Sequence, residues 1–63
     1  MRYPNLRAEM ARQGKTRNDL AHQIGKTRQT VSSWLLGKTE PRITEAQKIA
    51  DWLGCPVEYL FEE

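Results

Sequence analysis

Apolar residues recur along the chain at the three- and four-residue spacing of amphipathic helices, in short segments that each end near a glycine. Glycines at positions 14, 25, 37 and 54 follow these segments, where C-terminal helix caps usually carry this residue. No segment of the sequence shows the strict alternation of a half-buried strand. The pattern predicts an all-α fold of five helices, at residues 4–13, 17–24, 28–36, 43–53 and 57–61.

Each expected helix carries one apolar stripe that we expect to face the core. Two helix starts are marked by caps: Thr16, followed by Asp19 as in a capping box, and Thr27. The inward residues are expected to be Leu6 and Met10 in the first helix, Leu20, Ala21 and Ile24 in the second, Val31, Trp34 and Leu35 in the third, Ile43, Ala46, Ile49, Ala50 and Leu53 in the fourth, and Val57, Leu60 and Phe61 in the last.

The size and composition narrow the range of functions. A length of 63 residues predicts one small domain at residues 1–63, too small for a deep catalytic cleft. No apolar run approaches the roughly 20 residues that span a bilayer, and the N-terminus does not resemble a signal peptide. One cysteine, Cys55, and one histidine, His22, exclude a disulfide framework and a conventional zinc site. We expect a cytoplasmic protein with no cofactor, metal or small-molecule ligand, and no pair of groups is spaced for catalysis.

Charge is distributed unevenly along the chain. Residues 1–48 contain all ten basic residues and four acidic ones, for a net charge of +6, whereas residues 49–63 carry −4. A basic body suggests a polyanion as partner. Charge alone leaves open the alternative that these residues form ordinary solvated helix faces.

The second and third expected helices meet across a short turn, Gly25-Lys26-Thr27. Ala21 is small where the two helices must approach, Gly25 can adopt the positive φ of a sharp turn, and Val31 can pack into the angle between the helices. These residue types at these offsets satisfy the steric needs of a helix-turn-helix.

The outer face of the third helix combines Arg28, Gln29, Ser32 and Ser33 and carries no acid. Arg can bridge guanine O6 and N7, Gln can bridge adenine N6 and N7, and Ser can contact either base. The alternative is a solvated face, but such faces usually carry Glu or Lys, whereas two serines are poor helix formers. We therefore predict that these four residues contact DNA bases.

From Leu6 to Phe61 the sequence resembles the lambda-repressor-like, or Xre/Cro-type, helix-turn-helix family. The residues that carry the resemblance are Leu20-Ala21, Gly25, Thr27, Val31, Trp34, Gly37-Lys38, the segment Lys48-Ile49-Ala50-Asp51-Trp52-Leu53-Gly54 and Tyr59-Leu60-Phe61. The resemblance implies a five-helix fold that binds double-stranded DNA, usually as a homodimer on a two-fold symmetric operator, with bases read by Arg28, Gln29, Ser32 and Ser33.

The DNA backbone is expected to lie against the start of the second helix, which offers free N–H groups and a positive dipole end, and which this family uses as a clamp. Basic and hydroxyl side chains flank the third helix on both sides. The predicted phosphate contacts are Thr16, Arg17, Lys26, Thr27, Thr30, Lys38 and Arg42. Arg2, Arg7 and Lys48 are expected to be solvated charges.

Three residues depart from the family pattern or leave their roles open. Leu36 falls on the outward side of the third helix, where it either folds over the following loop or makes a dimer contact; an apolar contact to thymine methyls is the less favoured alternative. Arg42 stands where Ser, Thr or Asp would usually cap the fourth helix. Trp52 lies at the edge of an apolar stripe, where an exposed ring would suit a dimer interface.

The leading hypothesis is a small dimeric transcriptional regulator, a repressor of prophage, plasmid or mobile-element type. Its subunits can be monomers in solution that form the dimer only when they bind DNA. One alternative is an antitoxin that binds DNA and a toxin, although such proteins usually carry an extra segment and this sequence ends two residues after Phe61. The other alternative is a protein-interaction module, which would predict acidic or bulky apolar residues on the outer face of the third helix.

Overall fold

The computed structural model describes residues 2–63 and contains five helices in this part of the chain. They are α1 (Pro4–Arg12), α2 (Arg17–Ile24), α3 (Arg28–Leu36), α4 (Ile43–Leu53) and α5 (Val57–Leu60). The expected all-α fold is confirmed. The predicted bounds differ only at two C-terminal ends, since α1 and α5 each stop one residue earlier than expected.

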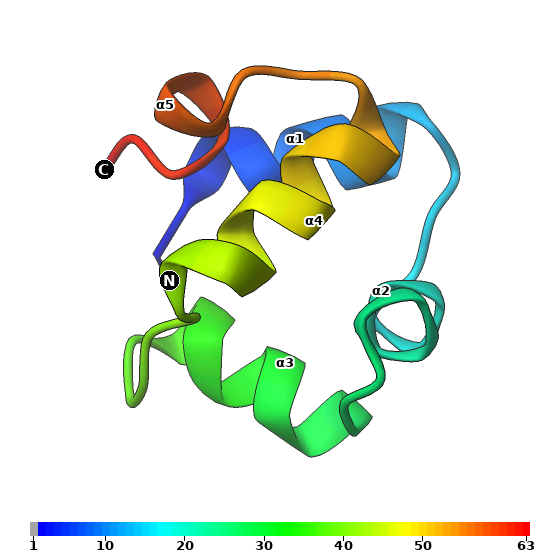
Figure 1. The fold of residues 1–63 in the computed structure, drawn as a ribbon, viewed down its shortest axis with the longest axis vertical. Helices are drawn as coiled ribbons and strands as arrows, with labels where there is room; N and C mark the ends of the chain where they lie inside the picture. The colour runs from blue at the N-terminus through cyan, green and yellow to red at the C-terminus, as the bar shows by residue number, and fades with distance from the viewer. Residues whose placement is uncertain (1) are drawn as a thin grey trace.

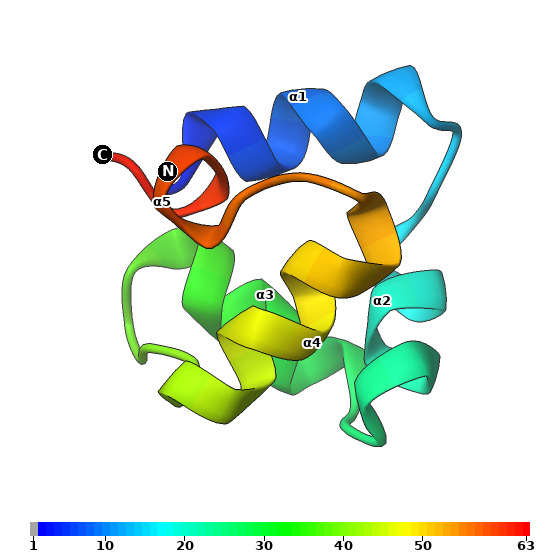
Figure 2. The ribbon, with the colours of Figure 1, turned by 45° about the horizontal axis from the view of Figure 1, so that its top comes forward.

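The helices surround one central core (Figure 1). α2 packs against α3 and α4, while α5 packs against α1 and α4. Figure 2 shows α1 and α5 together at one end of the molecule, with α2, α3 and α4 at the other. The Cα trace has principal extents of 22 × 21 × 21 Å.

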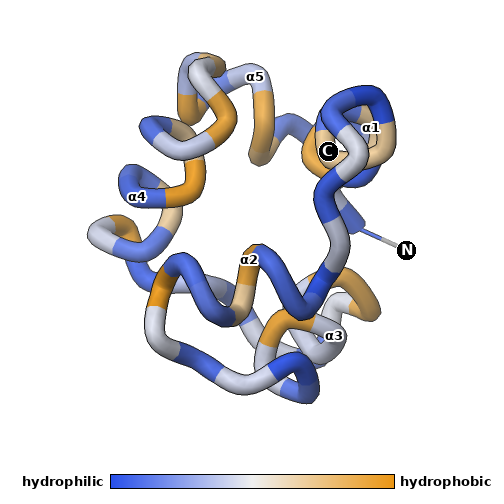
Figure 3. Tube along the Cα trace, turned by 90° about the vertical axis from the view of Figure 1, so that its right-hand side faces the viewer, coloured by the Kyte–Doolittle hydropathy of each residue, from blue (hydrophilic) through white to orange (hydrophobic). Residues whose placement is uncertain are grey.

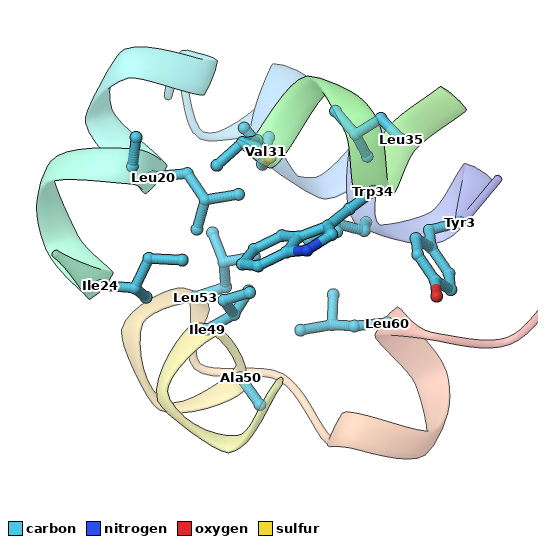
Figure 4. Close-up of a cluster of buried hydrophobic side chains, with 13 residues drawn as sticks. Tyr3, Leu20, Ile24, Val31, Trp34, Leu35, Ile49, Ala50, Leu53 and Leu60 are labelled. Carbon is cyan, nitrogen blue, oxygen red and sulfur yellow. The ribbon is translucent and has the colours of Figure 1, made fainter. Parts of the chain in front are cut away.

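The core consists of apolar side chains from every helix. In Figure 4 the Trp34 indole lies at its centre, with Leu20, Ile49, Leu53 and Leu60 around it. On α4 the hydrophobic positions turn inward and the hydrophilic positions outward (Figure 3). The buried hydrophobic residues are Tyr3, Leu6, Met10, Leu20, Ala21, Ile24, Val31, Trp34, Leu35, Ile49, Ala50, Leu53 and Leu60.

The first turn of α4 differs from the expected core. Ile43 was predicted to face inward, but it is 82% exposed because it is the first residue of α4 and projects beyond the packed part of the helix. Ala46, Val57 and Phe61 are half-buried rather than buried. Tyr3, which the helical pattern did not include, is buried, and its ring packs edge-on against Phe61 at a centroid distance of 5.0 Å.

A side-chain cluster joins the two ends of the described chain. Arg2 forms ion pairs with Glu40, in the loop between α3 and α4, and with Glu63. Its backbone N–H donates to the Leu35 carbonyl at 2.8 Å. Arg2 is therefore not the solvated charge that the sequence predicted. Its guanidinium holds the pKa of Glu63 below its ordinary value.

The α2–α3 turn has the geometry that the sequence predicted. Gly25 has φ of 70°, a left-handed conformation that side chains other than glycine rarely adopt. The Lys26 N–H then donates back to the Ala21 carbonyl at 2.9 Å. The buried Ala21 and the fully buried Val31 fill the angle between the helices.

Candidate nucleic-acid interface

The predicted base-contacting residues occupy the side of α3 that does not pack on the core. Arg28 and Gln29 are exposed, and Ser32 and Ser33 are half-buried. On the opposite side of the same helix Val31, Trp34 and Leu35 are buried. The structure therefore brings the four polar residues together as two adjacent rows, Arg28 with Ser32 and Gln29 with Ser33, each spaced by one helical turn. We call these four residues the outer face of α3.

The start of α2 lies beside this face and is closed by its own side chains. The Thr16 hydroxyl accepts from the Asp19 N–H at 3.1 Å, and the Thr16 N–H donates to Asp19 Oδ2 at 2.8 Å, which confirms the predicted capping box. These hydrogen bonds from Thr16 lower the pKa of Asp19. The sequence analysis expected a free N–H group at Thr16, but this N–H is already bonded to Asp19. The first-turn N–H groups outside the box belong to Arg17 and Asn18.

Arg17 reaches across to α3. Its Nη1 atom donates to Ser32 Oγ at 3.1 Å, which joins a residue predicted to contact phosphate to one predicted to contact a base. Both side chains are half-buried. Residue spacing within one helix does not indicate this contact, because it depends on how two helices cross.

The two threonines at the start of α3 share a hydrogen bond. Thr27 Oγ1 accepts from the Thr30 N–H at 3.2 Å, and the two hydroxyl oxygens lie 3.1 Å apart. Because one hydroxyl hydrogen is used between them, the pair can offer one O–H to a ligand rather than two.

Lys26, in the turn, forms an ion pair with Glu45 of α4, with Nζ and Oε2 3.2 Å apart. Glu45 also caps its own helix, since Oε1 accepts from the Arg42 N–H at 2.8 Å. The hydrogen bond from Arg42 and the nearby Lys26 lower the pKa of Glu45. Lys26 is therefore held partly neutralised, a restraint that the sequence did not indicate.

The remaining predicted phosphate contacts lie beyond the end of α3. The side chains of Lys38 and Arg42 are exposed, and neither forms an ion pair within residues 2–63. Arg42 occupies the N-cap position of α4 without a side-chain cap, and the Glu45 carboxylate accepts from the Arg42 N–H instead. Both cations can therefore reach solvent on the loop side of the outer face of α3.

Of the other singled-out residues, Trp52 and Cys55 lie outside α2 and α3, whereas Leu36 is the last residue of α3. Trp52 is half-buried, and Lys15 Nζ lies 4.3 Å from its ring centroid, so the chain itself covers part of the indole. Burial raises the pKa of the half-buried Cys55 thiol. Leu36 is 53% exposed, directly before the Gly37 cap. No helix of the described residues is both long and apolar enough to cross a membrane.

The comparison with protein families agrees with this arrangement. A model of a helix-turn-helix family matches residues 6–60, which include all five helices except the first two residues of α1. The chain belongs to this family. The predicted resemblance to Xre and lambda-repressor-like helix-turn-helix proteins is thereby confirmed. No curated protein sequence gives a significant match.

A solved structure is similar to this helix-turn-helix protein over most of its length. It is the solution structure of an SOS-response transcriptional repressor, LexA from Eubacterium rectale, with a TM-score of 0.81 and 32% sequence identity. The alignment covers 94% of the present chain and 63% of the repressor chain. The present chain therefore spans less than two thirds of the length of the repressor chain in that structure.

Proposed function

We propose that residues 1–63 form one DNA-binding domain of a transcriptional regulator, which inserts α3 into the major groove. The observation that carries the proposal is the outer face of α3, which presents Arg28, Gln29, Ser32 and Ser33 and no acid. Helix-turn-helix proteins dock the second helix of the motif in this way. The similar LexA structure is that of a transcriptional repressor, which supports repression as the outcome.

The charge of the α2–α3 region supports a phosphate-rich partner. Residues 16–38 contain four basic residues and a single acid, Asp19, whose carboxylate is occupied by the capping box. Thr16, Thr27 and Thr30 would offer polar contacts to the backbone, and Lys38 and Arg42 would supply charge. Lys26 would have to leave Glu45 before it could contribute fully.

We further propose that the protein acts as a homodimer on a two-fold operator. Among the large hydrophobic side chains of residues 2–63, Ile43 at 82% and Leu36 at 53% are the most exposed, and both flank the loop between α3 and α4. A second copy placed across a two-fold axis beside this loop would cover both side chains. Such a dimer would place its two α3 helices about 34 Å apart, in successive major grooves.

The test is a selection of binding sites from random duplex DNA by the purified protein at about 0.15 M salt. We expect an inverted repeat with half-site centres about 10 bp apart. Enrichment of a single half-site would support DNA binding but contradict the dimer. Weak, salt-sensitive retention without enrichment would contradict sequence reading and favour the protein-interaction or antitoxin alternative, for which Leu36 and Ile43 would be the contact.

A further inference from the structure

Arg17 and Ser32 form the side-chain hydrogen bond that links α2 to α3 within the described residues 2–63. The four ion pairs found in this part of the chain do not include Arg17, so no carboxylate neutralises its guanidinium. A serine hydroxyl is a weak anchor compared with a carboxylate. It therefore positions the cation while leaving its full charge available to a ligand.

The direction of the hydrogen bond determines what the pair can offer. A guanidinium only donates, so Ser32 Oγ is the acceptor and keeps its own hydrogen as a donor. Arg17 retains the N–H groups that Ser32 does not use. Together the two side chains present several donors and little acceptor capacity, which suits a ligand edge made of acceptors.

The position of the pair favours a base over a phosphate. Ser32 lies one helical turn after Arg28, within the outer face of α3. Because Ser32 holds the guanidinium against α3, the charge lies with the residues that enter the groove, rather than extending from the start of α2 toward the flanking DNA backbone. Arg17 was predicted from the sequence to contact phosphate, and the structure gives a reason to revise that role.

We propose that Arg17, positioned by Ser32, reads a guanine in each half-site. This inference rests on the proposed insertion of α3 into the major groove. Guanine presents two acceptors there, N7 and O6, whereas adenine adds a donor to its acceptor and cytosine presents a donor. A donor-rich pair therefore discriminates in favour of guanine, and the specificity surface extends from α3 to the first residue of α2.

The test compares the wild-type protein with Arg17→Lys, Ser32→Ala and the double variant, on the selected operator and on its single base-pair substitutions. Arg17→Lys keeps the charge but removes the planar fork. We expect the wild type to lose about tenfold or more in affinity when one particular G·C pair is replaced. In each single variant, replacing the same base pair should cost less affinity than it does in the wild type. The double variant should reduce this cost by no more than either single variant does.

Lys38→Gln provides the matched control, since it removes another cation, unpaired within the described residues, that is expected to contact only phosphate. It should weaken binding by the same factor on every sequence. The inference is overturned if Arg17→Lys also weakens all sequences equally, which would identify a phosphate contact. It is also overturned if Arg17→Lys and Ser32→Ala act at different base pairs. If the wild type prefers no sequence, the proposed function itself fails, an outcome visible before any variant is compared.

Discussion

The α2–α3 half of the molecule and the end formed by α1, α5 and the two chain ends are held together in different ways. In the α2–α3 half the contacts are local: a capping box over four residues at Thr16 and a glycine turn at Gly25. At the other end, contacts join residues more than 50 positions apart, such as the Asn5 amide donating to the Tyr59 carbonyl at 2.9 Å and the ion pair of Arg2 with Glu63.

The two regions also use their charges differently. At the α1–α5 end two cations are paired with acids, since Arg2 pairs with Glu40 and Glu63, and Arg12 pairs with the buried Glu9. Around α3, by contrast, Arg17, Arg28 and Lys38 have no acidic partner within residues 2–63. A basic residue is informative about a polyanion partner only when the fold leaves it unpaired, so the count of charges along the sequence overstates the binding surface.

The most damaging substitution should be one in the hydrophobic core, which both regions share. Leu20 is fully buried at the centre of the core, and Leu20→Ala should lower the free energy of unfolding by about 2–5 kcal/mol. A chain of 63 residues is expected to have only about 3–9 kcal/mol in total. Urea denaturation followed by circular dichroism measures the loss. Leu36→Ala, at a site 53% exposed, is the control and should change the monomer's stability by far less.

The next largest effect distinguishes the recognition of bases from the general attraction between a basic residue and DNA. Gln29→Ala should relax discrimination at one or two base pairs by about 1–3 kcal/mol, because an exposed amide on α3 would lose its bidentate contact with adenine. Binding titrations on the operator and its single-base variants measure this. Arg12→Gln, which changes a cation of the α1–α5 end, should leave DNA binding unaltered. Equal losses on every sequence for Gln29→Ala would show that this residue does not read bases.

A smaller effect concerns Lys26, the cation of the α2–α3 half that is paired. Glu45→Gln should keep an oxygen that accepts from the Arg42 N–H while it releases Lys26. Binding to any duplex should tighten, and the slope of log K against log salt should steepen by about one unit per protomer. Glu40→Gln, which removes a partner of Arg2, is the control and should not change the slope. An unchanged slope in Glu45→Gln would mean that Lys26 stays away from the phosphates.

The smallest expected effect is a dependence of stability on pH. The pKa values of Asp19 and Glu45 are lowered in the folded chain from 3.8 and 4.5 by hydrogen bonds at helix starts. Their contribution is therefore complete above about pH 4.5 and is lost as the pH falls through the lowered values. Thermal melting at a series of pH values from 6 to 3 should show a melting temperature that falls once the pH is below about 4.5. The fall should be shallower in Asp19→Asn, and an equal fall would contradict a role for this cap.

The sequence was a good guide wherever the determining contacts are local. Thr16, Thr27, Gly25 and Gly37 mark helix ends through hydrogen bonds that span only a few residues, so the bounds of α2 and α3 agree with the prediction. It was a poor guide where partners are distant in the chain. Nothing near Arg2 indicates Glu63, and a helical pattern does not include Tyr3, which precedes α1 in a left-handed conformation with φ of 54°.

The candidate site shows the same division. The outer face of α3 follows from helical phase, and the structure places all four of its residues away from the core. The contacts of Arg17 with Ser32 and of Lys26 with Glu45 depend on how α2 lies against α3 and α4. Sequence periodicity fixes directions around one helix axis but not the crossing of two helices, so these restraints could be found only from the fold.

The ion pair between Arg2 and Glu63 has a consequence for protein engineering. Both ends of the described chain lie on the same side of the molecule (Figure 1). A short flexible linker can therefore join them, and the chain can be reopened in the loop between α1 and α2. Such a circular permutant would keep the α2–α3 unit intact, with a fluorophore or a fused domain at new ends beside α2 instead of beside α5.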